Sequence, residues 1–146
     1  MDDNCIFCAI VEGRIPSHKV YEDEKTLAFL DIHPSTPGHT LVIPKLHIAR
    51  VEGLPEEDAH CLFAALHNIV GRIQEVMGAP ASTIGINNGQ ESGQEVPHVH
   101  IHVIPRSTGD RGGIIQGITP SSVSADQEEM RGIAERILAS ISDQRK

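Results

Sequence analysis

The sequence is poor in cysteine, in basic residues and in long apolar runs, and each shortage excludes a class of protein. Three cysteines cannot form a closed set of disulfides. Twelve Lys and Arg against 20 Asp and Glu give a formal net charge of -8, which argues against a nucleic-acid coat or a binder of anionic membranes. No apolar run approaches the roughly 18 residues of a membrane span, and the acidic start of the chain does not resemble a secretory signal. These absences predict a soluble cytoplasmic protein.

What the sequence does contain is enough apolar material for one core and many histidines. The chain has 146 residues, of which 39% are hydrophobic and nine are histidine. Cys5 and Cys8 form a C-x-x-C pair, which in a cytosolic chain is typical of metal or redox chemistry rather than of a structural bridge. We therefore expect a single domain over residues 1–146.

The clearest periodic pattern predicts a long helix over residues 56–77, closed by Gly78. Its apolar residues recur at i, i+3 and i+4 and form one stripe. The same pattern predicts a second helix over residues 126–142, with Ser124 and Gln127 as a capping box. The side chains expected to face inward from this second helix are Met130, Ile133, Ala134, Ile137, Leu138 and Ile141.

Extended segments account for much of the remaining chain. Residues 19–32 are typical of a hairpin around a polar turn, and residues 39–43 of a buried strand. Residues 83–87 and 98–104 complete the predicted strands. These elements predict an α+β fold: a five-stranded, mainly antiparallel sheet on which one long helix and a C-terminal helix pack.

Three histidines, His98, His100 and His102, alternate with apolar residues along the last predicted strand. Side chains alternate across a strand, so the imidazoles are expected on one face, with Cα atoms ~6.6 Å apart. One interpretation is a metal site, although this spacing does not readily let three successive histidines share one small ion. The other is nucleophilic catalysis by a neutral imidazole at phosphorus. The turn at residues 87–94 strengthens the second interpretation, because its backbone N–H groups and amides can hold phosphate oxygens.

This strand resembles the signature of the histidine triad (HIT) family, in which three histidines alternate with apolar residues. The segment His98–Ile104 carries the pattern, preceded by Gly93, Gln94 and Val96. The resemblance extends over roughly residues 5–106. Its further matching segments are Cys5–Cys8, Ile15–Pro16, Val20–Asp23, Ala28–Ile32 and Gly38–His47. Membership would imply the HIT-like fold, a purine nucleotide of the AMP type as ligand, and a homodimer.

The resemblance also implies an activity and a catalytic group. HIT proteins hydrolyse or transfer nucleotides at the α-phosphate of phosphoramidates, dinucleoside polyphosphates or similar adducts. The middle histidine, here His100, would be the nucleophile that forms a covalent nucleotidyl-histidine, while His102 would donate to a phosphate oxygen or to the leaving group. Gln94 and Asn87 would lie beside the phosphate. His39 would orient the triad from behind, although it equally suits a plain core or loop histidine.

A nucleoside pocket is implied by the same resemblance. Asp31 matches the position that accepts hydrogen bonds from both ribose hydroxyls, and a carboxylate suits two adjacent donors. The base would lie against apolar side chains, each of which could equally be ordinary core. These residues are Ile6, Phe7, Ile10, Ile15, Phe29, Leu30 and Ile32.

The resemblance further implies structural zinc. In the bacterial zinc-bearing branch, which is related to Hint, the ligands are two cysteines, a histidine after the Ile-Pro-Lys strand and the first triad histidine. The corresponding residues here are Cys5, Cys8, His47 and His98, a set that suits tetrahedral zinc and leaves no position open for water.

Glu95 departs from the pattern, because many relatives have Ser or Thr at this place near the leaving group. A carboxylate there is unfavourable beside a transferring phosphoryl group unless it turns outward or meets a basic leaving group. The predicted activity is cleavage at the α-phosphate of adenosine phosphoramidates or related adducts. The alternatives are a dinucleoside polyphosphate hydrolase, a nucleotide-binding sensor with little turnover, and a metalloenzyme whose triad holds a catalytic ion.

Overall fold

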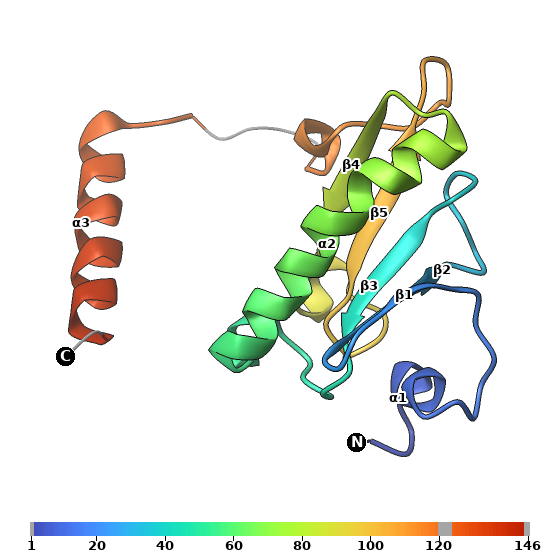
Figure 1. The fold of residues 1–146 in the computed structure, drawn as a ribbon. Coiled ribbons are helices and arrows are strands. Elements are labelled where there is room, and N and C mark those ends of the chain that lie inside the picture. The colour runs from blue at the N-terminus through green and yellow to red at the C-terminus, as the bar shows by residue number, and fades with distance from the viewer. Residues whose placement is uncertain (1, 120–123, 145–146) are drawn as a thin grey trace. The chain divides into compact units, whose positions relative to one another are not determined.

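The structure is a computed structural model that describes residues 2–119 and 124–144. Its contacts divide the chain into two compact units, residues 1–112 and residues 113–146. The first unit contains a five-stranded sheet and two α-helices, and the second contains the C-terminal helix (Figure 1). The single domain expected over residues 1–146 stays a prediction, and each unit is described below by itself.

In the first unit, every pair of neighbouring strands is antiparallel, and the strand order is β1-β2-β3-β5-β4. The expected α+β class is therefore confirmed. The strands are β1 (Lys19–Glu22), β2 (Thr26–Leu30), β3 (Thr40–Pro44), β4 (Ala81–Gly85) and β5 (Ile101–Arg106). The helices are α1 (Ile6–Val11) and α2 (Glu56–Met77), with short 3-10 turns η1 (Val51–Gly53) and η2 (Gln90–Ser92).

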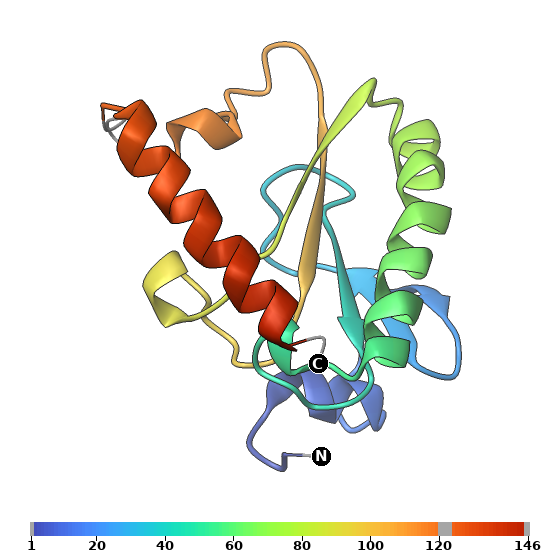
Figure 2. The ribbon, with the colours of Figure 1, turned by 90° about the vertical axis from the view of Figure 1, so that its left-hand side faces the viewer.

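Side-chain alternation along the central strands gives the sheet two apolar faces, each covered by one helix. On β3, Leu41 and Ile43 join a cluster with residues of α1, whereas Val42 between them joins a cluster with residues of α2. The turned view in Figure 2 shows α2 running beside β3 and β5. The first unit thus has one core under α1 and another under α2.

Helix α2 has the bounds that the periodicity predicts. Three acidic residues occupy its first turn, where they favour the positive end of the helix dipole. Leu62, Ala65 and Ile69 form its buried stripe. Gly78 closes the helix with φ 63°, a left-handed conformation that favours glycine.

The expected strands exist, but their bounds differ by one to three residues. The segment expected at 39–43 is Thr40–Pro44, and that expected at 83–87 is Ala81–Gly85. The histidine strand, expected at 98–104, begins as β5 only at Ile101. The Val99 N–H donates to the Ile48 carbonyl at 2.8 Å, so the first part of the triad is held by another loop.

In the second unit, η3 (Ile115–Gly117) precedes α3 (Gln127–Gln144). Asp126, rather than the expected Ser124, accepts a cap bond, since its Oδ1 lies 3.0 Å from the Glu128 N–H. Within this unit taken by itself, the apolar side chains predicted to face inward are exposed, from 39% at Ile133 to 66% at Leu138, and the packing of α3 on the sheet stays a prediction. The described part of this unit has no sheet or second α-helix that would bury them. Among the described helices of both units, none is long and apolar enough to cross a bilayer.

Candidate functional site

A cavity of about 470 Å³ lies on the α1 side of the sheet in the first unit. This volume falls in the range of small-molecule sites. Its lining includes every residue for which the sequence suggested contact with the base, ribose or phosphate, except Gln94. These residues are Ile6, Phe7, Ile10, Ile15, Phe29, Leu30, Asp31, Ile32, His39, Asn87, His100 and His102. The lining residues that were not assigned a site role are Pro16, Ser17, His33, Ser35, Leu41, Gly93, Glu95 and Val96.

The apolar lining residues are of two kinds. Phe7, Ile10 and Phe29 are buried in the α1 core, as ordinary core residues would be. Ile6, Ile15 and Ile32, in contrast, are 45%, 37% and 72% exposed. Exposed apolar side chains around a concave site favour the binding of an apolar ligand group.

His100 is held in one orientation at the edge of this cavity. Its Nδ1 lies 2.7 Å from the His98 carbonyl oxygen, which can only accept a hydrogen bond. In the neutral imidazole Nδ1 therefore carries the proton, and the lone pair lies on Nε2. The Phe7 ring packs edge-on against the imidazole at 5.1 Å between centroids. His100 is thus a buried imidazole with a fixed tautomer and a nucleophilic Nε2.

The tautomers of His39 and His102 follow from a chain of hydrogen bonds. The Ser35 backbone N–H donates to His39 Nδ1 at 3.0 Å, so the proton of His39 is on Nε2. That Nε2–H lies 2.9 Å from His102 Nδ1, which must accept. The proton of neutral His102 is therefore on Nε2, available as a hydrogen-bond donor. Ser35 acts through its backbone, and no residue-type pattern could have indicated it.

Burial keeps both of these histidines neutral near pH 7. Burial lowers the pKa of His39, against the opposing effect of Asp31. Burial also lowers the pKa of His102 to about 4, with smaller contributions from the neighbouring histidines. The hydrogen-bond chain thus operates without a positive charge at neutral pH.

Asp31 presents its carboxylate to the cavity from the segment that follows β2. Its Oδ1 accepts the His33 backbone N–H at 2.9 Å, and its Oδ2 lies 3.7 Å from His39 Nε2. These contacts fix the carboxylate while leaving acceptor capacity on both oxygens. A ligand with two adjacent donors suits this geometry.

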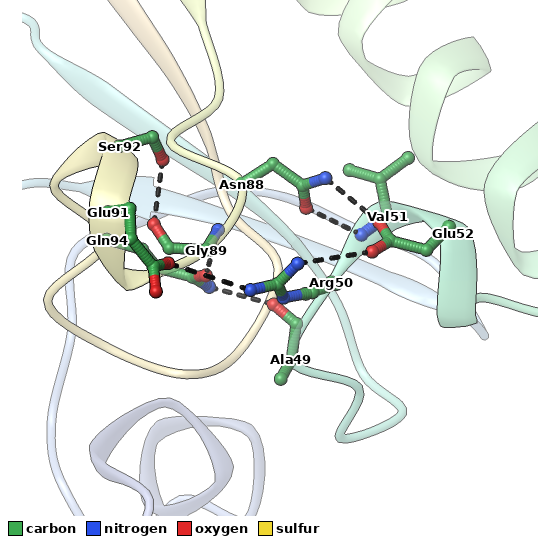
Figure 3. A network of polar contacts seen from close by, with 9 residues as sticks. All are labelled: Ala49, Arg50, Val51, Glu52, Asn88, Gly89, Glu91, Ser92 and Gln94. Carbon is green, nitrogen blue, oxygen red and sulfur yellow. Dashed lines mark hydrogen bonds and ion pairs between the residues drawn. The ribbon is translucent and has the colours of Figure 1, made fainter.

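Gln94, expected beside a phosphate, is instead fully engaged with backbone groups. Its Oε1 accepts the Gly89 N–H at 2.8 Å, and its Nε2 donates to the carbonyls of Ala49 and Val96 at 2.8 and 3.0 Å. Figure 3 shows this amide between the loop of η2 and the loop before η1. In this geometry Gln94 is a positioning residue, whereas Asn87 lines the cavity itself.

Ion pairs also join the same two loops (Figure 3). Arg50 contacts Glu52 at 3.6 Å and Glu91 at 3.8 Å, and Asn88 donates to Glu52 at 2.9 Å. Gly89 has φ 105°, and a Cβ there would lie 2.8 Å from Arg50 Nη2. The conformation therefore favours glycine at this position, whereas the flexible Arg50 side chain could move away from an added Cβ.

Two cysteines lie close to two histidines beside the cavity. Cys5 is the N-cap residue of α1, and Cys8 lies within that helix. The possible ligand atoms of Cys5, Cys8, His47 and His98 all lie within 4.8 Å of one another. Three S···Nδ1 distances, Cys5–His98, Cys8–His47 and Cys8–His98, are 3.5, 3.3 and 3.7 Å. Ideal zinc bond lengths place S and N ligands ~3.6 Å apart in a tetrahedron. The four side chains therefore fit Zn²⁺.

The surroundings of these ligands also suit a metal. His98 Nε2 lies 2.8 Å from the Pro44 carbonyl, which fixes the proton there and leaves Nδ1 free to bind. Burial lowers the pKa of His98 to about 4, which keeps the imidazole neutral. Burial raises the pKa of the Cys8 thiol, so a thiolate at this position requires a nearby cation.

A second group of possible metal ligands consists of Asp31, His39 and His102. Its two imidazole nitrogens are 2.9 Å apart, which is a hydrogen-bond distance. Two nitrogen ligands on one tetrahedral zinc would be separated by ~3.3 Å. The geometry of this group favours the hydrogen-bond chain rather than the catalytic ion considered as an alternative.

The fold and site thus define an α+β protein with a histidine-lined cavity and a Cys₂His₂ cluster. A family model described as HIT domain matches residues 12–109, and the chain belongs to the HIT family. It is 37% identical over 138 residues to adenosine 5'-monophosphoramidase hnt1 of Schizosaccharomyces pombe, covering 94% of this chain and 98% of the relative.

Two solved structures show the same fold. The crystal structure of SMU.412c from Streptococcus mutans is similar with a TM-score of 0.88 and 40% identity, over 97% of this chain and 87% of that one. A Zn-bound histidine triad family protein from Mycobacterium smegmatis is similar with a TM-score of 0.67 and 36% identity, over 97% of both chains. Together with the ligand geometry, this likeness supports Cys5, Cys8, His47 and His98 as a structural zinc site.

Proposed function

We propose that this protein is a nucleotide hydrolase that cleaves at the α-phosphate of adenosine phosphoramidates or related adducts through a covalent nucleotidyl-His100. The observation that carries the proposal is the hydrogen bond from His100 Nδ1 to the His98 carbonyl, because it makes Nε2 the nitrogen that can act as a nucleophile in the cavity. The similarity to a phosphoramidase supports this reaction class.

The reaction proceeds in two displacements. His100 Nε2 attacks the α-phosphorus, and the bond to the leaving group breaks with its electron pair going to the leaving atom. The hydrogen bond from His39 to His102 Nδ1 supports a role for His102 in this step, in which its Nε2–H donates to a phosphate oxygen or to that leaving atom. Water then attacks the phosphorus and displaces His100, which releases the nucleoside monophosphate.

The same cavity accounts for the binding of the nucleoside. Asp31 accepts hydrogen bonds from the ribose hydroxyls, and the exposed apolar side chains of Ile6, Ile15 and Ile32 cover the base. Asn87 lies beside the phosphate. The purine preference and the homodimer implied by the family, and the cytoplasmic location expected from the composition, remain predictions.

Zinc at the four-ligand site would hold α1 against the sheet. A bound zinc ion would supply cross-linking rather than a reactive water, because four protein ligands complete a tetrahedron. Helix α1 has six residues, too few to be stable alone, and it contributes Ile6, Phe7 and Ile10 to the cavity. The metal site and the ligand site therefore share one short helix.

Trapping the intermediate tests the proposal. With adenosine phosphoramidate and rapid acid or denaturant quench, mass spectrometry should find an added nucleotidyl group on the peptide that contains His100. His100→Ala should lose turnover by several orders of magnitude and form no adduct, while binding nucleotide within roughly tenfold of the parent. His67→Ala, at an exposed position of α2, is the control and should react normally. Hydrolysis by His100→Ala at the parent rate would contradict the proposal.

A further inference from the structure

The cavity has no lysine or arginine among the described residues that line it. Its two carboxylates come from Asp31 and Glu95. A nucleotide brings negative charge into this space. The phosphate must therefore rely on neutral donors, and each additional negative charge on the substrate is repelled by the carboxylates.

Glu95 is the carboxylate without a partner. It is exposed and makes no ion pair or side-chain hydrogen bond with any residue in the described part of the chain. Arg50, the cation that joins these two loops, contacts Glu52 and Glu91 (Figure 3). Glu95 thus lines the cavity with no cation opposite its carboxylate, whereas Glu52 and Glu91 in these loops are paired with Arg50.

The position of Glu95 relative to the nucleoside follows from the elements that form the cavity. The apolar lining comes mainly from α1, β2 and the segments that follow them, and Asp31 lies at the end of β2. Glu95, Gly93 and Asn87 come from the connection between β4 and β5, which leads directly into His100. With the base and ribose on the first set, the leaving group occupies the part of the cavity that this connection lines.

We propose that Glu95 is a specificity-determining residue that selects nucleotide adducts whose leaving group carries a positive charge, such as an amine-bearing chain. The inference rests on the proposed function and adds the charge class of the leaving group. A cationic leaving group supplies the counter-charge that the cavity lacks. A polyphosphate leaving group, in contrast, brings further negative charge toward Glu95.

A matched pair of substrates tests the proposal on the full-length protein. Two adenosine 5'-phosphoramidates are compared, one with a 3-aminopropyl group on the nitrogen and one with a butyl group of similar length. The parent should favour the ammonium-bearing substrate in kcat/KM by about tenfold, which corresponds to ~1.4 kcal/mol. Because Glu95 is exposed, this preference should shrink as salt is raised.

Glu95→Gln should reduce the ratio of kcat/KM for the ammonium-bearing substrate to kcat/KM for the butyl substrate to near one. The control is Glu91→Gln, which removes the same charge from the same loop outside the cavity lining and should keep the parent ratio. The ratio, rather than activity alone, separates charge selection from a structural role. An unchanged ratio in Glu95→Gln would overturn this inference alone, whereas failure of the parent to hydrolyse either substrate would overturn the proposed function as well.

The same substitution should have the opposite effect on a polyanionic substrate. For diadenosine triphosphate, Glu95→Gln should raise kcat/KM several-fold, since it removes a repulsion. Glu91→Gln should leave that value within about twofold of the parent. A fall in kcat/KM for both the cationic and the polyanionic substrate would show that Glu95 acts on folding or loop position, which contradicts charge selection.

Discussion

Asp31 presents a fixed carboxylate to the cavity, and its replacement separates ribose recognition from general binding. Asp31→Asn keeps the size of the side chain but replaces one acceptor oxygen with a donor. Affinity for adenosine monophosphate should fall by about 10- to 100-fold, the range for a hydrogen bond to a charged group. The 2'-deoxy nucleotide should lose less, because it has one hydroxyl fewer to lose. Calorimetry on the two ligands measures this, and equal losses would count against the ribose role.

The protonation of His102 makes the stability of the folded protein depend on pH. Its pKa in the folded protein is about 4, below the ordinary value near 6.5, so the unfolded chain takes up its proton first as pH falls. The neutral histidine therefore stabilises the fold above about pH 6.5, and this contribution is lost between pH 6.5 and 4.

Substitution of His102 should weaken this dependence. For His102→Gln, the free energy of unfolding should fall less steeply from pH 6.5 to 4, by at most ~1.4 kcal/mol per pH unit and less because the side chain is only partly buried. Urea unfolding across this range is the measurement. His60→Gln, at an exposed site on α2, should keep the parent slope. Identical slopes for all three proteins would contradict the effect of burial on His102.

At the scale of elements, α1 depends on the metal ligands. Cys8→Ser should abolish stoichiometric zinc binding, increase amide exchange in residues 5–11 and weaken nucleotide binding, because α1 and its N-cap residue supply both thiols and part of the cavity. Zinc analysis, hydrogen exchange and calorimetry measure these effects. Cys61→Ser, on α2 outside the metal cluster, should bind one zinc like the parent. Full zinc content in Cys8→Ser would refute the ligand assignment.

Helix α2 holds the other face of the sheet through its buried stripe. Leu62 is fully buried, so Leu62→Ala should destabilise the protein by about 2–5 kcal/mol. Val76 in the same helix is 82% exposed, and Val76→Ala should change stability by less than ~0.5 kcal/mol. Chemical denaturation measures both. Equal effects would mean that the α2 stripe does not form the core.

The sequence was informative wherever local pattern determines structure. The bounds of α2 follow from its periodicity and from Gly78, and alternation correctly placed the triad opposite the apolar residues of β5. The start of β5 was not predictable, because it depends on the bond between Val99 and the distant Ile48. The stripe on α3 follows from periodicity as well, but periodicity does not show what covers it, and its packing on the sheet stays a prediction.

The same distinction applies to the site. The histidines, cysteines and aspartate of the cavity and the metal cluster are residue types that indicate catalysis or metal binding in a sequence, and the structure brings them together. The Ser35 N–H carries no such signal, because every residue but proline has one. Gln94 was assigned to the phosphate by resemblance, but its bonds to Gly89 and Ala49 arise from loops that only the fold brings together.

At the scale of the whole molecule, the cavity, the metal cluster and both cores lie within the first unit. A chain ending at Gly112 should therefore fold cooperatively, bind one zinc and form the nucleotidyl adduct on His100. Unfolding curves, metal analysis and adduct mass spectrometry, with the full chain as reference, are the measurements. Failure of the shorter chain to fold would show that the first unit depends on residues 113–146.

Phe7 makes edge-on ring contacts with both His98, at 5.8 Å, and His100, at 5.1 Å. One side chain thus touches a metal ligand and the nucleophile at once. Any gain in nucleotide affinity on metal loading must, by thermodynamic linkage, be matched by an equal gain in metal affinity on nucleotide binding. The nucleotide concentration around this protein would then help to set how firmly it retains its zinc against competing chelators.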